Sequence, residues 1–332
     1  MLIALELLSA LVLLVIASDA FTNAVEWIGS LYGLTRSAMG SVVAAIGSSL
    51  PETMVAIVAI LVLRDPASQA VGIGAVLGAP FMLATVVFAL IGLTAIVRRK
   101  LTADAQRLNA NLHGASFGLI LFGFTFALAV GASFDPTPTV RTVTGVIVLA
   151  AYGLHFFYHI RRKGAEAEEQ PPRLRLAPRA VRPPAFAVFG QLALALGVTI
   201  AASHWFVTAV AAASAEVGVP PLVVSLFLSP IATELPEMMN VVLWMRRGLD
   251  DLAVGNVLGA MIFQTSVASA IGLFATPWRL DANAYVACGF TLFAVALVLG
   301  ATSIRRRLDS RTLALCGLFY VLFISYAFVH AR

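Results

Sequence analysis

Gly47-Ser48-Ser49-Leu50-Pro51-Glu52 lies inside a long apolar stretch, and Ala232-Thr233-Glu234-Leu235-Pro236-Glu237 stands 185 residues later in a similar setting. An ionised carboxylate costs several kcal/mol inside a lipid bilayer, so a glutamate in such a stretch indicates a functional site. Carboxylate oxygens are hard ligands that suit calcium or sodium ions. We therefore predict a buried cation site that includes Glu52 and Glu237.

A proline precedes each of these two glutamates. Proline has no backbone N–H, so the carbonyl four residues earlier loses its helical partner. The carbonyls concerned belong to Gly47 and Ala232. Inside a membrane a freed carbonyl must find another partner. We therefore expect an unwound helix at each motif, with these two carbonyls among the cation ligands.

The composition is that of a membrane protein. Of the 332 residues, 60% are hydrophobic and 12% are charged. Apolar runs of about 20 residues, the length that spans a bilayer, recur along the whole chain. We predict an all-α membrane protein with ten transmembrane helices, near residues 2–18, 40–63, 71–97, 113–133, 142–160, 185–213, 220–245, 251–277, 284–303 and 312–330.

The basic residues give an orientation to these spans. If the N-terminus is outside, 18 of the 22 lysines and arginines fall in inside loops, as expected for cytoplasmic loops. We expect a multi-pass protein of the cell membrane with both termini outside. The cytoplasmic loops account for the net charge of +5, so we expect no nucleic acid as a partner. The partners that we expect are inorganic cations and the lipid bilayer.

An internal repeat divides the chain. Residues 17–54 align with residues 202–239 without a gap, with 11 of 38 positions identical. We predict a first five-helix repeat over 1–160, a cytoplasmic linker over 161–184 and a second five-helix repeat over 185–332. Five spans are an odd number, so the second repeat enters the membrane upside down, as in many secondary transporters. A regulatory role for the linker stays open.

A second pair of matching segments extends the repeat. Gly-Ala-Val-Leu-Gly-Ala over residues 74–79 matches Gly-Asn-Val-Leu-Gly-Ala over residues 255–260 once four extra residues are allowed in the first copy. Glycines four residues apart allow two helices to approach closely. We predict that these helices pack tightly against the Pro-Glu helices.

The repeat predicts how the two acids work together. If the halves face each other, Glu52 and Glu237 converge and can neutralise one divalent cation. Without that cation the two carboxylates repel, and at least one takes up a proton. A site of this kind alternates between divalent cations and monovalent cations or protons. The hydroxyls of Ser48, Ser49 and Thr233 either ligate the cation or bond to carbonyls of their own helices.

The motifs carry a family resemblance. G-S-S-L-P-E resembles the G-T-S-L-P-E signature of the sodium/calcium exchanger family, within the cation/calcium antiporters, and A-T-E-L-P-E resembles its counterpart in the second repeat. G-N-V-L-G-A-M-I-F-Q, residues 255–264, is similar to the family's G-N-x-x-G-S-N-I-F-N/D segment. The resemblance implies an antiporter that exchanges calcium for sodium or another cation, with Glu52 and Glu237 at its central site.

Several positions depart from the family pattern. Ala79 and Ala260 stand where the family has serine ligands, and Leu83 and Gln264 stand where it has Asn or Asp. Glu234 stands where the family usually has serine. The calcium centre, with Gln264 and Glu234 counted among its candidate ligands, is thus better preserved than the sodium sites. We hypothesise that Glu234 carries a proton, so that H+ is the coupling ion; the alternative is that Glu234 only lines a vestibule.

Two other classes of function compete with antiport. An intramembrane hydrolase could use paired carboxylates, but the chain has no H-E-x-x-H or C-x-x-C motif, and we expect neither an enzyme nor a cofactor. A cation channel could also use acidic residues. Duplicated half-sites suit a carrier better, in which the first and sixth spans move against a core of the second, third, seventh and eighth.

Overall fold

The computed structural model describes all residues except 1, 33–44, 102–107, 109, 162–170 and 331–332. Over the described residues the chain is helical and has no strands. The helices, with π-helices labelled η, are α1 Leu2–Leu31, α3 Ala45–Ile57, η2 Val58–Leu63, α4 Pro66–Met82, η3 Leu83–Val87, α5 Phe88–Leu101, α6 Leu112–Gly131, α7 Pro138–Arg161, α8 Ala185–Val217, α9 Pro221–Thr233, α10 Leu235–Arg246, α11 Asp250–Phe263, η4 Gln264–Ala268, α12 Ser269–Ala275, α13 Ala282–Arg305, α14 Ser310–Leu315 and α15 Gly317–His330.

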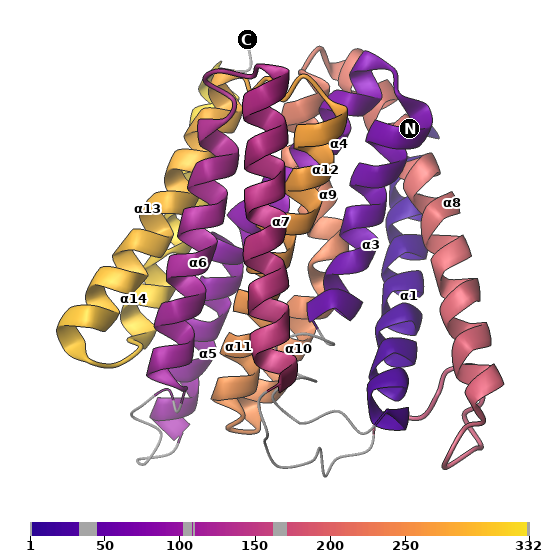
Figure 1. The fold of residues 1–332 in the computed structure, drawn as a ribbon, viewed down its shortest axis with the longest axis vertical. Helices are drawn as coiled ribbons and strands as arrows, with labels where there is room; N and C mark the ends of the chain where they lie inside the picture. The colour runs from indigo at the N-terminus through magenta and orange to yellow at the C-terminus, as the bar shows by residue number, and fades with distance from the viewer. Residues whose placement is uncertain (1, 33–44, 102–107, 109, 162–170, 331–332) are drawn as a thin grey trace.

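Each of the ten expected spans corresponds to one helix or to a run of consecutive helices. Among the described residues, eight helices are long and apolar enough to cross a membrane, and two shorter apolar helices cover Glu52–Leu63 and Pro221–Ile231. The all-α membrane architecture is confirmed. In Figure 1, α1 starts at the end of the molecule where both termini lie, whereas α8 starts at the opposite end, so the first helices of the two repeats run in opposite directions. We call these the terminus side and the linker side.

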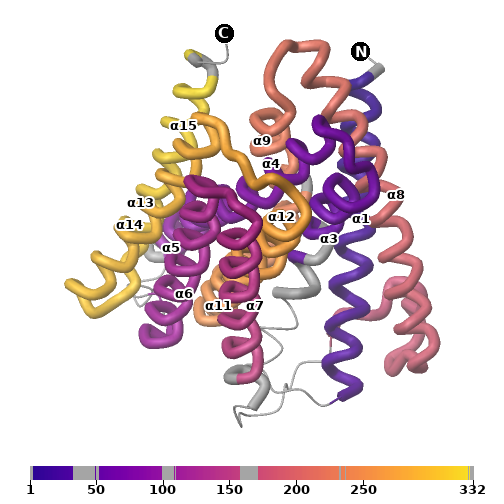
Figure 2. Tube along the Cα trace, turned by 45° about the horizontal axis from the view of Figure 1, so that its top comes forward, coloured from indigo at the N-terminus to yellow at the C-terminus, as the bar shows by residue number. Residues whose placement is uncertain are grey.

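The helices divide into an enclosed centre and a peripheral pair. In the most apolar stretch of Asp250–Ala275, 83% of residues are buried, and the corresponding share for Pro66–Arg98 is 67%. For α1 and α8 the shares are only 22% and 28%. Figure 2 shows α1 and α8 side by side at one edge of the bundle. These two helices therefore present most of their apolar surface outward, as a lipid-facing pair should.

Glycines bring α4 against α9. A Cβ added at Gly78 would lie 2.6 Å from the carbonyl oxygen of Leu226, and one at Gly74 would clash with the carbonyl of Leu222. Ser225 Oγ donates a hydrogen bond of 2.6 Å to the carbonyl oxygen of Val71 across the same interface. The predicted close packing is confirmed in the first repeat. A Cβ added at Gly255 would meet no described atom within 4 Å apart from its own helix backbone and chain neighbours, and the segment that corresponds to α9 in the first repeat lies largely outside the described residues.

An ion pair joins the two repeats on the linker side. Arg98, near the end of α5, donates to both carboxylate oxygens of Asp250 at the start of α11, at 2.6 and 2.7 Å. The same guanidinium donates to the carbonyl of Met245 at the end of α10. Two parallel bonds fix a guanidinium relative to a carboxylate more strongly than a single contact does. This fork ties α5 of the first repeat to α10 and α11 of the second.

Candidate functional site

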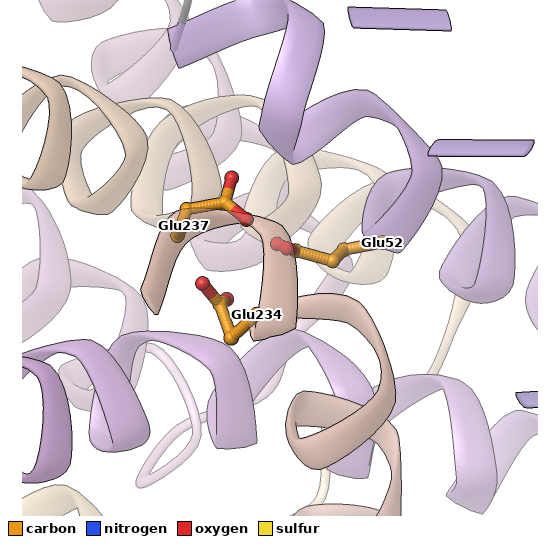
Figure 3. A group of neighbouring side chains, drawn as sticks. All are labelled: Glu52, Glu234 and Glu237. Atoms are coloured by element: carbon orange, nitrogen blue, oxygen red, sulfur yellow. The ribbon is translucent and has the colours of Figure 1, made fainter. Parts of the chain in front are cut away.

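Three glutamates meet in the centre of the bundle. Glu52 comes from α3, Glu234 lies between α9 and α10, and Glu237 lies in the first turn of α10. One carboxylate oxygen from each lies within 4.8 Å of the others, and all three side chains are buried. Figure 3 shows the three carboxylates turned toward one another. The structure thus brings Glu52 and Glu237 together from opposite repeats and adds Glu234.

The backbone differs at the two motifs. In the second repeat, α9 ends at Thr233 and α10 begins at Leu235, so the helix is interrupted at Glu234. Pro236 falls at the start of α10, where its missing N–H leaves no helical bond unmade. Glu237 lies in the first turn of α10, where the helix dipole favours a negative charge.

In the first repeat, the expected unwinding at Pro51 is wrong over the described residues, because α3 is continuous from Ala45 to Ile57. A membrane helix can continue through a proline when hydroxyls and neighbouring helices satisfy the backbone groups around it. Beside Pro51, the hydroxyl of Thr53 donates to the carbonyl oxygen of Ser49 at 3.0 Å. Only the second motif therefore supplies a helix interruption at the site.

Gln264 joins the acids from the two repeats. Its Nε2 donates to Oε1 of Glu234 at 2.9 Å and also to Oε2 of Glu52. The Oε1 atom of Gln264 has no hydrogen-bond partner among the described residues. Glu52 Oε1 and Glu234 Oε2 have none there either. Buried acceptors without partners are costly in a dry interior. The single amide of Gln264 cannot satisfy all of these oxygens. The cluster is therefore suited to receive a cation or a proton.

Two of the three π-helices in the described residues, η3 and η4, lie at matching positions of the two repeats. η3 begins at Leu83 and η4 begins at Gln264, the pair aligned by the two glycine motifs. π-turns are rare and occur frequently at functional sites. Neither was predicted from the sequence. The chemistry at the two positions is nevertheless different, since Leu83 is a buried apolar side chain that offers no ligand atom.

The remaining predicted ligands have different surroundings. Ser49, the repeat partner of Glu234, is fully buried, and its Oγ has no partner among the described residues. The hydroxyl of Thr233 donates to the carbonyl oxygen of Ser229 at 3.0 Å. This is the bond to its own helix that was predicted as the alternative to ligation, and it leaves the lone pairs of the Thr233 oxygen free to ligate a cation. Gly47 and Ser48 lie in α3 and Ala232 in α9, but the side chains of Ser48 and Ala232 lie outside the described residues. As cation ligands, these residues remain predictions.

A further buried polar side chain lies in the same π-helix as Gln264. Ser266 in η4 is completely buried, and its Oγ has no partner among the described residues. Its position two residues after Gln264 gave no signal, because serine is ordinary in membrane helices.

Residues 2–161 and 187–330 match the family described as sodium/calcium exchanger protein. The chain belongs to the sodium/calcium exchanger family. The family consists of exchangers, which are transporters and not enzymes. The chain is also similar to the candidate antiporter CaxA of Alkalimonas amylolytica, at 26% identity over 90% of this chain and 88% of the relative.

Two solved exchanger structures share the fold. The H+/Ca2+ exchanger CAX superposes with a TM-score of 0.78 at 13% identity, over 98% of this chain and 82% of that chain. The sodium-calcium exchanger NCX_Mj superposes with a TM-score of 0.61 at 18% identity, over 100% and 99%. The expected fold, ten helices in two inverted repeats, is confirmed for this member of the sodium/calcium exchanger family.

Proposed function

We propose that this exchanger moves Ca2+ across the cell membrane in exchange for H+ or Na+, by alternating access to the site of Glu52, Glu234 and Glu237. The observation that carries the proposal is the convergence of three buried carboxylates from both repeats, with oxygens within 4.8 Å of one another. Carboxylate, amide and hydroxyl oxygens are the ligands that Ca2+ takes in proteins. In this proposal Gln264 Oε1 and Ser49 Oγ complete the ligand set, together with the carbonyls of Gly47 and Ala232 and the hydroxyls of Ser48 and Thr233.

The charge of the site favours exchange over one-way transport. Three ionised carboxylates carry three negative charges, and Ca2+ neutralises two of them. When Ca2+ leaves, the remaining repulsion is strong because the site is buried and the effective dielectric is low. A change between the outward-open and inward-open states is therefore costly while the site is empty. The protein changes state again only after monovalent cations or protons have taken the place of Ca2+. This requirement couples the two fluxes.

The identity of three residues favours protons as the coupling ion. Glu234 adds a group that can bind a proton where the family usually has serine, and it contacts Gln264 directly. Ala79 and Ala260 offer no hydroxyl of the kind that would hold sodium. The proposal therefore assigns Glu234 as a proton carrier, with sodium coupling as the alternative.

The peripheral position of α1 and α8 supports a moving pair. Both helices pack against the helices of the site on one side and expose much of their surface on the other. We assign them to slide or tilt against a core of α3, α4, α9, α10 and α11. By the distribution of basic residues, the linker side is assigned to the cytoplasm and both termini to the outside.

Flux measurements in proteoliposomes test the function. Calcium flux is followed with sodium and pH gradients imposed independently, across vesicles that contain the purified full chain. We expect calcium movement against its own gradient when the pH gradient is imposed. A current that follows only the electrochemical gradient of calcium, without counter-transport, would show a channel and overturn the proposal.

A further inference from the structure

Residues 171–184 lie across the linker-side ends of α1 and α8, and we call them the strap (Figures 1 and 2). The carbonyl oxygen of Pro172 in the strap accepts two hydrogen bonds from α1. Asn23 Nδ2 donates at 3.0 Å and Trp27 Nε1 donates at 2.8 Å. The strap thus begins with a fixed attachment to the first helix of the first repeat.

Gln191 of α8 links the strap to both helices. Its Oε1 accepts from the backbone N–H of Leu176 at 2.8 Å, and its Nε2 donates to the carbonyl oxygen of Ala20 and to Asn23 Oδ1, at 2.8 and 3.0 Å. Leu174 is completely buried against Trp27 and Val188. A segment held by these bonds and a buried leucine presents its other side chains in a defined direction.

Arg175 forms the remaining attachment. Its guanidinium donates to both carboxylate oxygens of Asp19, at 2.8 and 3.0 Å. Asp19 follows twelve uncharged residues of α1, and its side chain is 53% exposed. Trp27 lies beyond it, and tryptophan is enriched where a membrane meets water. The strap therefore lies at the membrane–water interface.

The outer surface of the strap combines positive charge with exposed apolar side chains. Arg173, Arg179 and Arg182 are exposed, and the strap contains no acidic residue. Arg179 and Arg182 make no ion pair with any residue that the structure describes. Beside them the apolar side chains of Leu176, Val181 and Phe186 are 55%, 66% and 80% exposed. In water such a surface is unfavourable, but at a bilayer surface the apolar groups reach the acyl chains while the guanidinium groups reach phosphates.

We propose that the strap is a binding site for the headgroups of anionic phospholipids in the leaflet on the linker side. Guanidinium groups bind phosphate oxygens through paired hydrogen bonds. Arg179 and Arg182 supply these groups, and Val181 and Phe186 hold the segment against the lipid. Because the strap is bonded to α1 and α8, the lipid is held by the helix pair that lies outside the core. The binding itself does not depend on which cation the exchanger transports.

The test uses the purified full chain in detergent and native mass spectrometry with added phosphatidylglycerol or phosphatidylcholine. We expect preferential binding of phosphatidylglycerol, weakened about tenfold or more in Arg179→Gln/Arg182→Gln, since each basic residue near an anionic surface contributes about 1 kcal/mol. The matched control is Arg306→Gln/Arg307→Gln, an equal loss of charge in the linker-side loop after α13, which should bind as the unmodified chain does.

Three results would overturn the proposal. Equal binding of both lipids would remove the preference for anionic headgroups. Equal loss in the two double variants would show attraction to the whole basic face and not to the strap. Displacement of the lipid by millimolar glycerol phosphate would show a site for free phosphate instead of a membrane lipid.

Discussion

The two Pro-Glu helices are partners in the repeat, yet their surroundings differ. Val58, just after α3, is 1% exposed, whereas Leu243, at the same place in the second repeat, is 47% exposed. Met54 is partly buried, and its partner Met239 is 64% exposed. The first repeat's helix is covered on the terminus side by an apolar cluster formed with α1, α4 and α8, whose members are Ala10, Leu14, Val55, Ala59, Val71, Ala75, Ala202, Phe206, Val207 and Val210.

This difference shows that related sequences adopt an asymmetric arrangement. The pair α1 and α8 packs on α3 and α4 at the terminus side, while on the linker side α10 keeps an exposed apolar row of Leu235, Met239 and Leu243. These residues are four apart and share one face of the helix. In an exchanger built from inverted repeats, the opposite state would cover this row and uncover the equivalent surface of α3.

The largest effect on transport is expected at Glu52 and Glu237, where the two repeats should contribute alike to the site. Glu52→Gln and Glu237→Gln should each reduce calcium flux in proteoliposomes by about 100-fold or more, since removing one charge from a buried charged set costs about 3–5 kcal/mol. Both variants should remain folded, because each loses a repelling charge.

The matched control for these two variants is Glu216→Gln, an exposed acid near the end of α8, which should transport normally. Flux retained in either central variant would mean that the two repeats do not share one site.

The next effect tests the asymmetry at Glu234, whose repeat partner is Ser49. One proton driven by one pH unit corresponds to about 1.4 kcal/mol, or a tenfold accumulation of its exchange partner. Glu234→Gln should therefore reduce pH-driven calcium accumulation about tenfold per unit of the gradient. Accumulation that stays at the level of the unmodified chain and of Glu216→Gln would remove Glu234 as the proton carrier.

Chemical labelling compares the two helices directly. A cysteine at Leu243 should react with a small membrane-permeant thiol reagent on the order of tenfold faster than one at Val58, because exposed sites need no local opening. The native Cys288 and Cys316 are both buried and should contribute little. Calcium or a low pH that favours the opposite state should bring the two rates closer. Equal rates under all conditions would show that the difference in burial has no counterpart in the membrane.

The smallest effect concerns the glycines. Gly74→Ala should destabilise the protein by about 1–3 kcal/mol, because the added Cβ overlaps the α9 backbone. Gly255→Ala should change the free energy of unfolding by less than about 0.5 kcal/mol. Thermal unfolding in detergent measures both. An equally large loss at Gly255 would indicate that the second repeat is packed as tightly as the first.

Much of the architecture could be predicted from the sequence. Apolar runs indicated all ten spans, because a bilayer demands about 20 apolar residues for each crossing. The repeat offset and the odd number of spans placed Glu52 and Glu237 in opposite halves, and the structure brings them together. The G-x-x-x-G motif of Gly74 and Gly78 predicted a close contact with a Pro-Glu helix, and α4 packs against α9, which leads into the second Pro-Glu motif.

Other features depend on tertiary contacts that a single sequence does not display. Proline removes one hydrogen bond, but the neighbours decide whether the helix breaks, so α3 continues through Pro51 while the second motif is interrupted at Glu234. The π-turn at Gln264 and its amide bonds to two acids arise from packing between repeats. The attachment of the strap through Gln191 also joins residues distant in sequence, for which hydropathy gives no signal.

Calcium binding to the purified protein, measured by isothermal titration calorimetry, is the most direct test of a single site built by both halves. We expect one calcium per chain in the unmodified protein, and no measurable binding in either Glu52→Gln or Glu237→Gln. Unchanged calcium affinity in one of these variants would contradict the shared site.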